Sequence, residues 1–229
     1  MKKFVCLLVI VCVLGFFAFI PAEAGWFGHW VLYDDFNSGI IDTNLWDIDD
    51  SNATIEIIGG RLKITHNWSE NDSNGLIFKI NPKGIKAVKM RVMVGEIDGH
   101  LQARIGGYIG EEQDGSLIFK RVSVRTDGSG RERLDCWAGE DPYNRHYTEF
   151  INTVITGNFI VDEWFEIGMN FNRWISECWV KDFRKDVSFF SPPLLPPAAN
   201  EAQYKYIGTR SLSEGGSAVV WIDDVYVRY

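Results

Sequence analysis

Short runs of alternating apolar and polar residues fill most of this sequence, and no stretch keeps the spacing of an amphipathic helix. Neighbouring side chains of an extended chain point to opposite faces of a sheet, so each run predicts a strand with one buried face. Glycine, asparagine and aspartate separate the runs and favour turns. We therefore expect an all-β protein in which two antiparallel sheets pack face to face.

The predicted strands share this alternation and run from five to twelve residues each. They are Val31 to Phe36, Thr54 to Ile58, Arg61 to His66, Gly75 to Ile80, Lys86 to Val94, Leu101 to Ile109, Ser116 to Thr126, Arg131 to Ala138, Tyr147 to Thr156, Trp164 to Asn172, Ile175 to Lys181, Tyr204 to Arg210, and Ser217 to Arg228. The sequence from Asn81 to Gly84 predicts a turn. The segment Ser191 to Asn200 holds four of the seven prolines and predicts an extended crossing between sheets.

Two acidic motifs stand in the first and last predicted strands: Tyr33 to Phe36 and Trp221 to Val225. Both combine apolar and acidic residues as a half-buried strand does, so we expect these strands to pair and bring their aspartates together. Such pairing would close the sandwich. Trp46, Trp164 and Trp221 are expected in the core, because large aromatic residues at apolar strand positions usually are.

The first 24 residues have the three parts of a signal peptide. Lys2 and Lys3 precede an apolar run from Phe4 to Ile20, and an Ala-x-Ala cleavage site ends at Ala24. An uncleaved membrane anchor is the alternative, because the run is only slightly shorter than a membrane span. Cleavage predicts a secreted protein, or one of the periplasm or cell surface.

Removing 24 of the 229 residues leaves 205, from Gly25 to Tyr229, a length that β-sandwiches often use as one domain. Without Lys2, Lys3 and Glu23, the totals of 23 basic and 31 acidic residues fall to 21 and 30, a net charge of −9. This surplus of negative charge argues against nucleic acid or an anionic membrane as a partner. The sequence leaves the oligomeric state open.

Export changes the interpretation of the two cysteines that remain after cleavage. In an oxidising compartment Cys136 and Cys178 can form a disulfide, and two buried free thiols are the alternative. Zinc is not expected, because structural zinc sites need about four Cys or His ligands. The histidines lie far apart in the sequence, at His29, His66, His100 and His146.

A set of short motifs follows in order along nearly the whole expected mature chain. They are Asp34-Asp35-Phe36 ahead of Trp46, Gly59 to Ile64, Trp164 to Ile167, Cys178 to Asp182, and Ile222 to Val225. This order resembles that of the concanavalin A-like lectins and glucanases, which include family 16 glucanases and laminin G-like modules. The resemblance implies a two-sheet antiparallel jelly-roll β-sandwich, and a shared fold alone does not fix the function.

The family 16 glucanases carry a strand with the motif Glu-x-Asp-x-x-Glu or Glu-x-Asp-x-Glu, in which two carboxyls on one face serve as nucleophile and acid. Glu96 and Asp98 resemble the start of this motif, but the second glutamate is absent. Gly95 and Gly99 bound these residues, so we expect a turn here. The strand Ser116 to Thr126 is expected at the catalytic place, and it has no carboxylate.

Arginine and tryptophan gather at strand positions that alternate with apolar ones. The residues expected on one polar sheet face are Arg91, Arg104, Arg121, Arg125, Arg131, Arg133, Trp137 and Trp179. Aromatic rings stack on the CH faces of sugars, and arginine binds carboxylates or sulfates through planar donors. This predicts a carbohydrate-binding surface, with Trp68 as a further stacking residue from a polar loop. An ordinary polar solvent face is the alternative.

The resemblance also implies a structural calcium ion between the terminal strands, because related glucanases hold one there. The implied ligands are the backbone oxygens of Asp35 and Gly60 together with Asp223, and hard oxygen donors suit calcium. A buried acid that is satisfied by hydrogen bonds without metal is the alternative for Asp223.

The sequence therefore predicts an exported, non-catalytic carbohydrate-binding β-sandwich. One alternative is a glycan-active enzyme, such as a hydrolase or a lyase acting on acidic polysaccharide. A lyase would need arginine to neutralise a uronate and a Tyr or His to move a proton, and His100, Gln102, Arg104 and Tyr108 supply these residue types. A second alternative is a structural or adhesion module of the cell surface.

Overall fold

The computed structural model describes residues 28–67, 73–97, 101–109, 116–126, 132–142, 148–156, 162–171, 178–183, 187–190, 204–211 and 217–229. The regular elements in these ranges are all strands, joined by turns and loops, with the following bounds: β1 Val31–Asp34, β2 Trp46–Asp49, β3 Ala53–Ile57, β4 Leu62–Asn67, β5 Ser73–Phe78, β6 Ala87–Ile97, β7 Leu101–Ile109, β8 Ser116–Thr126, β9 Glu132–Pro142, β10 Thr148–Thr156, β11 Trp164–Asn170, β12 Cys178–Asp182, β13 Val187–Phe190, β14 Tyr204–Ser211 and β15 Ser217–Arg228. For β8, β9, β10 and β13 the structure describes the backbone.

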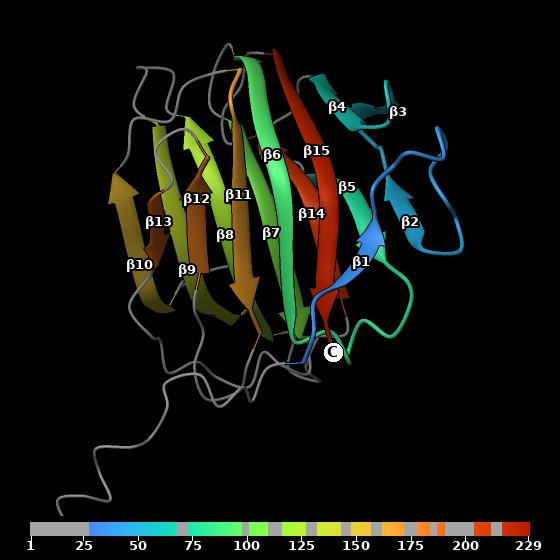
Figure 1. Cartoon of the computed structure of the whole chain (residues 1–229). Helices are drawn as coiled ribbons and strands as arrows, with labels where there is room; N and C mark the ends of the chain where they lie inside the picture. The colour runs from blue at the N-terminus through green and yellow to red at the C-terminus, as the bar shows by residue number, and fades with distance from the viewer. Residues whose placement is uncertain are drawn as a thin grey trace, which may run out of the picture.

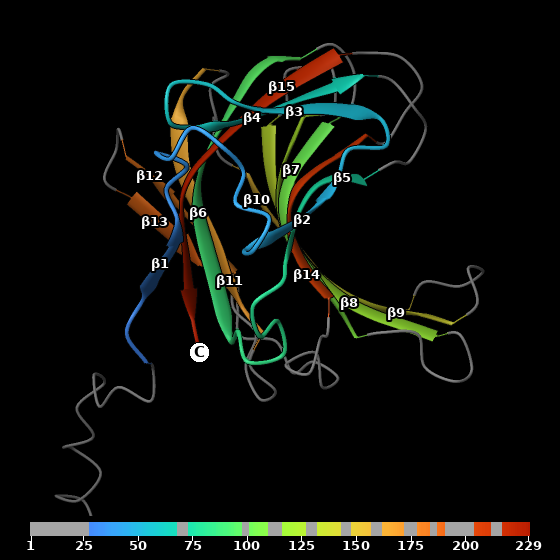
Figure 2. The same cartoon turned by 90° about the vertical axis from the view of Figure 1, so that its right-hand side faces the viewer.

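The strands form two antiparallel sheets that lie one behind the other (Figure 1). The eight-stranded sheet has the order β13-β12-β11-β6-β15-β4-β3, and β1 pairs with β15 beside this path. The seven-stranded sheet has the order β10-β9-β8-β7-β14-β5-β2. The chain crosses between the sheets at several points, for example between β6 and β7, whereas β7 to β10 follow one another within the seven-stranded sheet. The architecture is thus the predicted jelly-roll β-sandwich, and Figure 2 shows the two layers from the side.

One apolar core fills the space between the sheets. Val88, Met90 and Val92 of β6 are fully buried, while Lys89 and Arg91 between them are only partly buried. In the other sheet, Ala103 and Ile105 of β7 are also fully buried. Burying one such aliphatic side chain contributes about 1.5–3 kcal/mol, so alternation along the strands determines which face turns inward.

The terminal strands pair as the sequence predicts. Val31 of β1 lies opposite Val227 of β15, and Asp34 lies opposite Val225. The two acidic motifs are therefore brought to one region of the eight-stranded sheet. Figure 1 shows β1 crossing beside the lower half of β15.

A bulge interrupts β15 at Asp224. The register with β6 shifts between Asp223 and Tyr226, and Asp224 has a positive φ of 47°. The extra residue breaks strict alternation, so Ile222 and Val225 are both fully buried although they are three positions apart. Strict alternation from Ile222 would put Asp224 in the core and Val225 on the outer face, and the bulge reverses this.

The tryptophans divide between the core and the outer surface. Trp46 is fully buried, which confirms the prediction for this residue. Trp164 and Trp221 are only partly buried, because they alternate with the core residues Phe165, Val220 and Ile222. The prediction of a core position is wrong for these two. Both lie on the outer face of the eight-stranded sheet.

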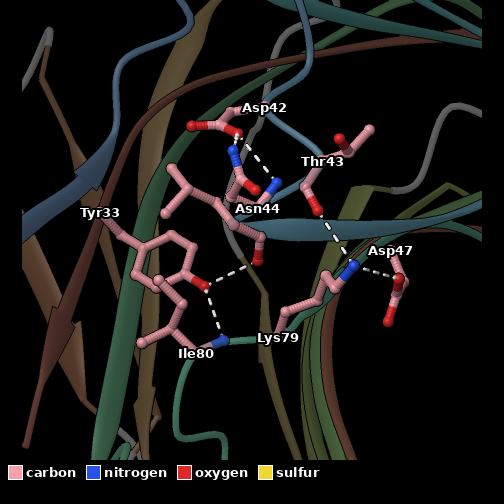
Figure 3. Close-up of polar contacts among 8 residues, drawn as sticks. Tyr33, Asp42, Thr43, Asn44, Asp47, Lys79 and Ile80 are labelled. Carbon is pink, nitrogen blue, oxygen red and sulfur yellow. Dashed lines mark hydrogen bonds and ion pairs between the residues drawn. The ribbon is translucent and has the colours of Figure 1, made fainter.

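Hydrogen bonds and an ion pair connect the region from β1 to β2 with the end of β5 (Figure 3). The hydroxyl of Tyr33 donates to the carbonyl of Leu45 at 2.8 Å. Lys79 Nζ donates to the carbonyl of Thr43 at 3.0 Å and lies 3.0 Å from the carboxylate of Asp47. These contacts hold the chain against the seven-stranded sheet.

The turn after β5 is confirmed: the N–H of Gly84 donates to the carbonyl of Asn81 at 2.9 Å. The prediction that Gly95 and Glu96 form a turn is wrong, because β6 continues to Ile97, where it pairs with Ala218 of β15. Asp98 and the segment from Ser191 to Asn200 lie outside the described residues. Within the described ranges no helix is long and apolar enough to cross a membrane.

Candidate functional site

The outer side of the seven-stranded sheet carries most of the predicted ligand-binding positions. Ala103 and Ile105 face the core, so Gln102 and Arg104 occupy the opposite face of β7. Residues paired across antiparallel strands share a face. We call this surface the arginine face and define it by the positions of Gln102, Arg104, Arg121, Arg125, Arg133 and Trp137.

Strand register brings the arginine positions next to one another. Gln102 of β7 pairs with Arg125 of β8, which pairs with Arg133 of β9. Further along the same strands, Arg121 of β8 pairs with Trp137 of β9. Adjacent strands lie about 4.8 Å apart, so these positions form one compact group. The backbone register thus places these positions on one face of the seven-stranded sheet.

Arg104 is the member of the arginine face whose side chain the structure describes. It is 1% exposed, and the centre of its guanidinium lies 4.9 Å from the ring centroid of Tyr206 on β14. A guanidinium stacked on an aromatic ring is held in a fixed orientation. Arg104 is therefore part of the base of this face and not a freely moving surface cation.

Tyr204 and Tyr206 are residues that the sequence interpretation missed. Their ring centroids lie 6.0 Å apart, and Tyr204 is 37% exposed. Their register partners in β7 are Tyr108 and Gly106, so they extend the arginine face by one strand. Their spacing on either side of Lys205 in a predicted strand is a signal that could have identified them.

Arg91 and Trp179 do not belong to this group, and the expectation that they share its face is wrong. Arg91 lies on β6 and Trp179 on β12, both in the eight-stranded sheet. Arg91 Nη1 pairs with Asp224 Oδ2 at 3.0 Å, and its guanidinium lies 5.2 Å from the ring centroid of Trp164. Alternation predicted the polar face of each strand correctly, but it does not say to which sheet the strand belongs.

Other predicted site residues are placed only in part. Gln102 and Tyr108, named for the lyase alternative, lie on β7 at arginine-face positions, and Arg104 between them is buried. His100, Trp68 and Arg131 lie outside the described residues. Glu96 lies on β6 in the other sheet, away from the arginine face.

Asp223 lies at the bulge, where the resemblance implies a calcium ligand. Its carboxylate accepts a hydrogen bond from the N–H of Asp224 at 2.9 Å, and Oδ2 is 3.7 Å from Arg61 Nε. Burial, and then the charge of Asp224, raises the pKa of Asp223 although Arg61 and Arg91 act to lower it. The negative charge is thus incompletely compensated, and a cation beside it would be stabilising.

Asp35 and Gly60, whose backbone oxygens are the other two implied calcium ligands, both lie next to Asn37. The N–H of Asn37 donates to Asp35 Oδ1 at 3.1 Å, and a Cβ on Gly60 would lie 2.6 Å from Asn37 Oδ1. In the described ranges, no group of three or more His, Cys, Asp or Glu side chains forms a metal site. Calcium would therefore depend on backbone oxygens, and the donor chemistry fits a hard cation.

Both cysteine positions lie on inner faces of the sandwich. Cys178 on β12 is 2% exposed. Cys136 on β9 pairs with Val122, which pairs with the fully buried Ile105. The neighbouring strands β8 and β11 lie against each other across the core. A disulfide between Cys136 and Cys178 stays a prediction that this arrangement accommodates.

No protein-family model and no curated protein sequence matches this chain. Solved structures with a similar fold include the GlcNAcα1-4Gal-releasing endo-β-galactosidase of Clostridium perfringens, with a TM-score of 0.59 and 11% identity. That match covers 91% of this chain and 64% of the galactosidase, so the chain spans less than two thirds of that protein.

Two further structures match over nearly their whole length. The laminarinase of Flavobacterium sp. UMI-01 has a TM-score of 0.59 and 10% identity, and the match covers 89% of this chain and 100% of the laminarinase. Lectin II of Ulex europaeus has a TM-score of 0.53 and 9% identity, and the match covers 88% of this chain and 98% of the lectin. The chain therefore has the concanavalin A-like jelly-roll β-sandwich fold.

Proposed function

We propose that this protein is an exported carbohydrate-binding β-sandwich without catalytic activity, and that the arginine face binds the glycan. The observation that carries the proposal is the adjacent register of Arg121, Arg125 and Arg133 on two neighbouring strands. Asp135 of β9 pairs with Ser123 between these positions, so three arginine positions share the face with one carboxylate position and leave a surplus of positive charge. The arrangement supports a ligand with carboxylate or sulfate groups, such as a uronic acid-containing or sulfated glycan.

Aromatic positions beside the arginines support a sugar rather than a simple anion. Trp137 pairs with Arg121, and the exposed Tyr204 lies beside the same face on β14. Rings of this kind stack on the CH face of a pyranose, while arginine binds its charged substituent. The similar folds of a lectin, a laminarinase and an endo-β-galactosidase agree with a role in glycan recognition.

The sequence of β8 argues for binding without turnover. This strand is expected at the catalytic place, and it has no Asp or Glu from Ser116 to Thr126. Glycoside hydrolysis of the usual kind needs two carboxyl groups about 5–10 Å apart across the scissile bond. Export follows from the predicted signal peptide, and calcium between the terminal strands would stabilise the fold without taking part in binding.

A panel of neutral and acidic glycans tests this function when it is assayed for both binding and reaction products. We expect binding of at least one acidic glycan, with no unsaturated or reducing-end product. Turnover that disappears in His100→Ala or Tyr108→Phe would replace the proposal by the lyase alternative. Failure to bind every glycan would favour the structural or adhesion module.

A further inference from the structure

The side chain of Trp179 lies across the outer surface of the eight-stranded sheet. Trp179 of β12 pairs with Gly168 of β11, and a Cβ on Gly168 would collide with the six-membered ring of the indole. The glycine therefore lets the ring cover the backbone of the neighbouring strand. Figure 1 shows β12, β11 and β6 side by side in this sheet. One ring face packs on the sheet, and the residue as a whole is partly exposed.

A hydrogen bond and an ion pair fix the orientation of this indole. Trp179 Nε1 donates to Glu166 Oε1 at 3.2 Å. Lys89 Nζ lies 3.0 Å from Glu166 Oε2, so the carboxylate joins the indole to a lysine. The side chains of Lys89 and Glu166 are 22% and 19% exposed. Polar groups of both signs thus border the ring and remain within reach of a ligand.

Trp30 stands beside Trp179 at a steep angle. The ring centroids are 6.0 Å apart and the ring planes differ by 69°. Lys89 lies 5.2 Å and Arg228 5.0 Å from the centroid of Trp30. Trp179 and Trp30 therefore form a corner, with one ring as its base and the other as its wall. Both are partly exposed.

Trp164 on the same sheet shows what a purely structural tryptophan looks like. The guanidinium groups of Arg61 and Arg91 lie 5.1 Å and 5.2 Å from its ring centroid, so cations already occupy it. Among the cations that the structure describes, none lies over the ring of Trp179. Of the outer-face tryptophans Trp164, Trp179 and Trp221, Trp179 is the one whose ring has no described cation over it.

We propose that Trp179, Trp30, Glu166 and Lys89 form a second carbohydrate-binding site, separate from the arginine face, that takes a neutral pyranose ring. A sugar stacked on Trp179 places its ring edge, with the hydroxyl groups, beside Glu166 and Lys89. The carboxylate accepts from hydroxyls and the ammonium donates to them. The Glu166–Lys89 pair thus offers both an acceptor and a donor for sugar hydroxyls, which suits a neutral hexose.

The test is titration of the full-length mature protein with neutral hexasaccharides of glucose, galactose and N-acetylglucosamine. The indole N–H signals of the protein, labelled with nitrogen-15, report which tryptophan is contacted. We expect at least one of these oligosaccharides to shift the Trp179 signal, and Trp179→Ala to weaken its binding by about ten-fold or more. Trp179→Phe keeps a ring and should weaken binding less than Trp179→Ala does.

Two control variants separate this site from the arginine face. Trp221→Ala removes another outer-face tryptophan of the same sheet and should leave neutral-sugar binding unchanged. The double variant Arg121→Ala, Arg125→Ala should also leave it unchanged, because its residues lie on the other sheet. Equal affinity of Trp179→Ala and the parent protein, or no shift of the Trp179 signal by any of the three sugars, would overturn the second site while leaving the arginine face untouched.

Discussion

The indole Nε1 of Trp46 donates a hydrogen bond to Asp34 Oδ2 over 2.7 Å. The other carboxylate oxygen of Asp34 accepts from the backbone N–H of Phe36 at 2.8 Å, where the chain has a positive φ of 56°. One acid therefore satisfies the polar atom of a fully buried tryptophan and holds the turn that follows β1. The acidic motif at the start of the domain has a structural role.

Asp34→Ala should lower the free energy of unfolding by about 2–4 kcal/mol, because it leaves the buried indole N–H without its charged partner. Urea unfolding followed by tryptophan fluorescence measures this change. Asp35→Ala is the matched control, because the neighbouring carboxylate is solvent-exposed and bonds only within its own turn. An equal decrease in stability in both variants would contradict the role assigned to Asp34.

The buried amine of Lys205 should make the stability of the protein depend on pH. Lys205 is fully buried, its Nζ donates to the carbonyl of Pro82, and it lies 4.9 Å from the ring centroid of Phe171. Burial, and then the charge of Lys86, lowers the pKa of Lys205 from 10.5 to about 7. Between these two values the unfolded chain binds a proton that the folded chain does not. The free energy of unfolding should therefore rise with pH, by up to about 1.4 kcal/mol per pH unit.

Urea unfolding between about pH 7.5 and about pH 9 checks this slope. Lys205→Met should flatten it, because the variant has no proton to take up at this position. Lys83→Met alters an exposed lysine of the nearby turn and should leave the slope unchanged. A slope of the same size in Lys205→Met and in the parent protein would show that Lys205 keeps its proton in the folded state.

The predicted Cys136–Cys178 disulfide can be measured by mass. We expect the mature protein to be two hydrogens lighter before reduction than after it. Reduction should then lower the free energy of unfolding by about 2–4 kcal/mol, since a cross-link restricts the unfolded chain. The variant Cys136→Ser, Cys178→Ser should unfold at the same urea concentration with and without reductant. Identical masses before and after reduction would establish two free thiols.

Calcium should stabilise the protein through Asp223. The raised pKa of Asp223 means that its protonated form contributes stability at low pH, and this contribution disappears as the pH rises through that pKa. At neutral pH a bound cation would stabilise the folded protein instead. The free energy of unfolding should rise by about 2.7 kcal/mol when calcium is in roughly a hundred-fold excess over its dissociation constant. Thermal unfolding in EDTA and in excess calcium measures the difference. The difference should vanish in Asp223→Asn, and its absence from the parent protein would favour the metal-free alternative.

The sequence predicts the fold class and most strands because alternation directly reflects which face is buried. It misses β2 and β13, which have four residues each, too few for the pattern to stand out. It also does not reveal the bulge in β15, which adds one residue to the strand and inverts the alternation after it. Such local irregularities depend on pairing with β6, which a single sequence does not display.

The candidate site was predictable strand by strand but not as a whole. Arg121, Arg125 and Arg133 share a face as expected, since β8 and β9 form a hairpin and stay in one sheet. Trp179 was expected beside them and lies in the other sheet, because the chain crosses from one sheet to the other between β10 and β11, and alternation of side chains does not encode such crossings. The position of the Trp179 ring over Gly168 likewise depends on the pairing of β11 with β12, which the sequence does not display.

The most direct test of the arginine face is calorimetric titration of an acidic oligosaccharide into the parent protein and into Arg121→Ala, Arg125→Ala. Removing one charge-assisted hydrogen bond should weaken binding about ten-fold, so we expect a dissociation constant about a hundred-fold higher in the double variant. Lys63→Ala, on the outer face of the other sheet, should bind as the parent does. An unchanged dissociation constant in the double variant would contradict glycan binding by this face.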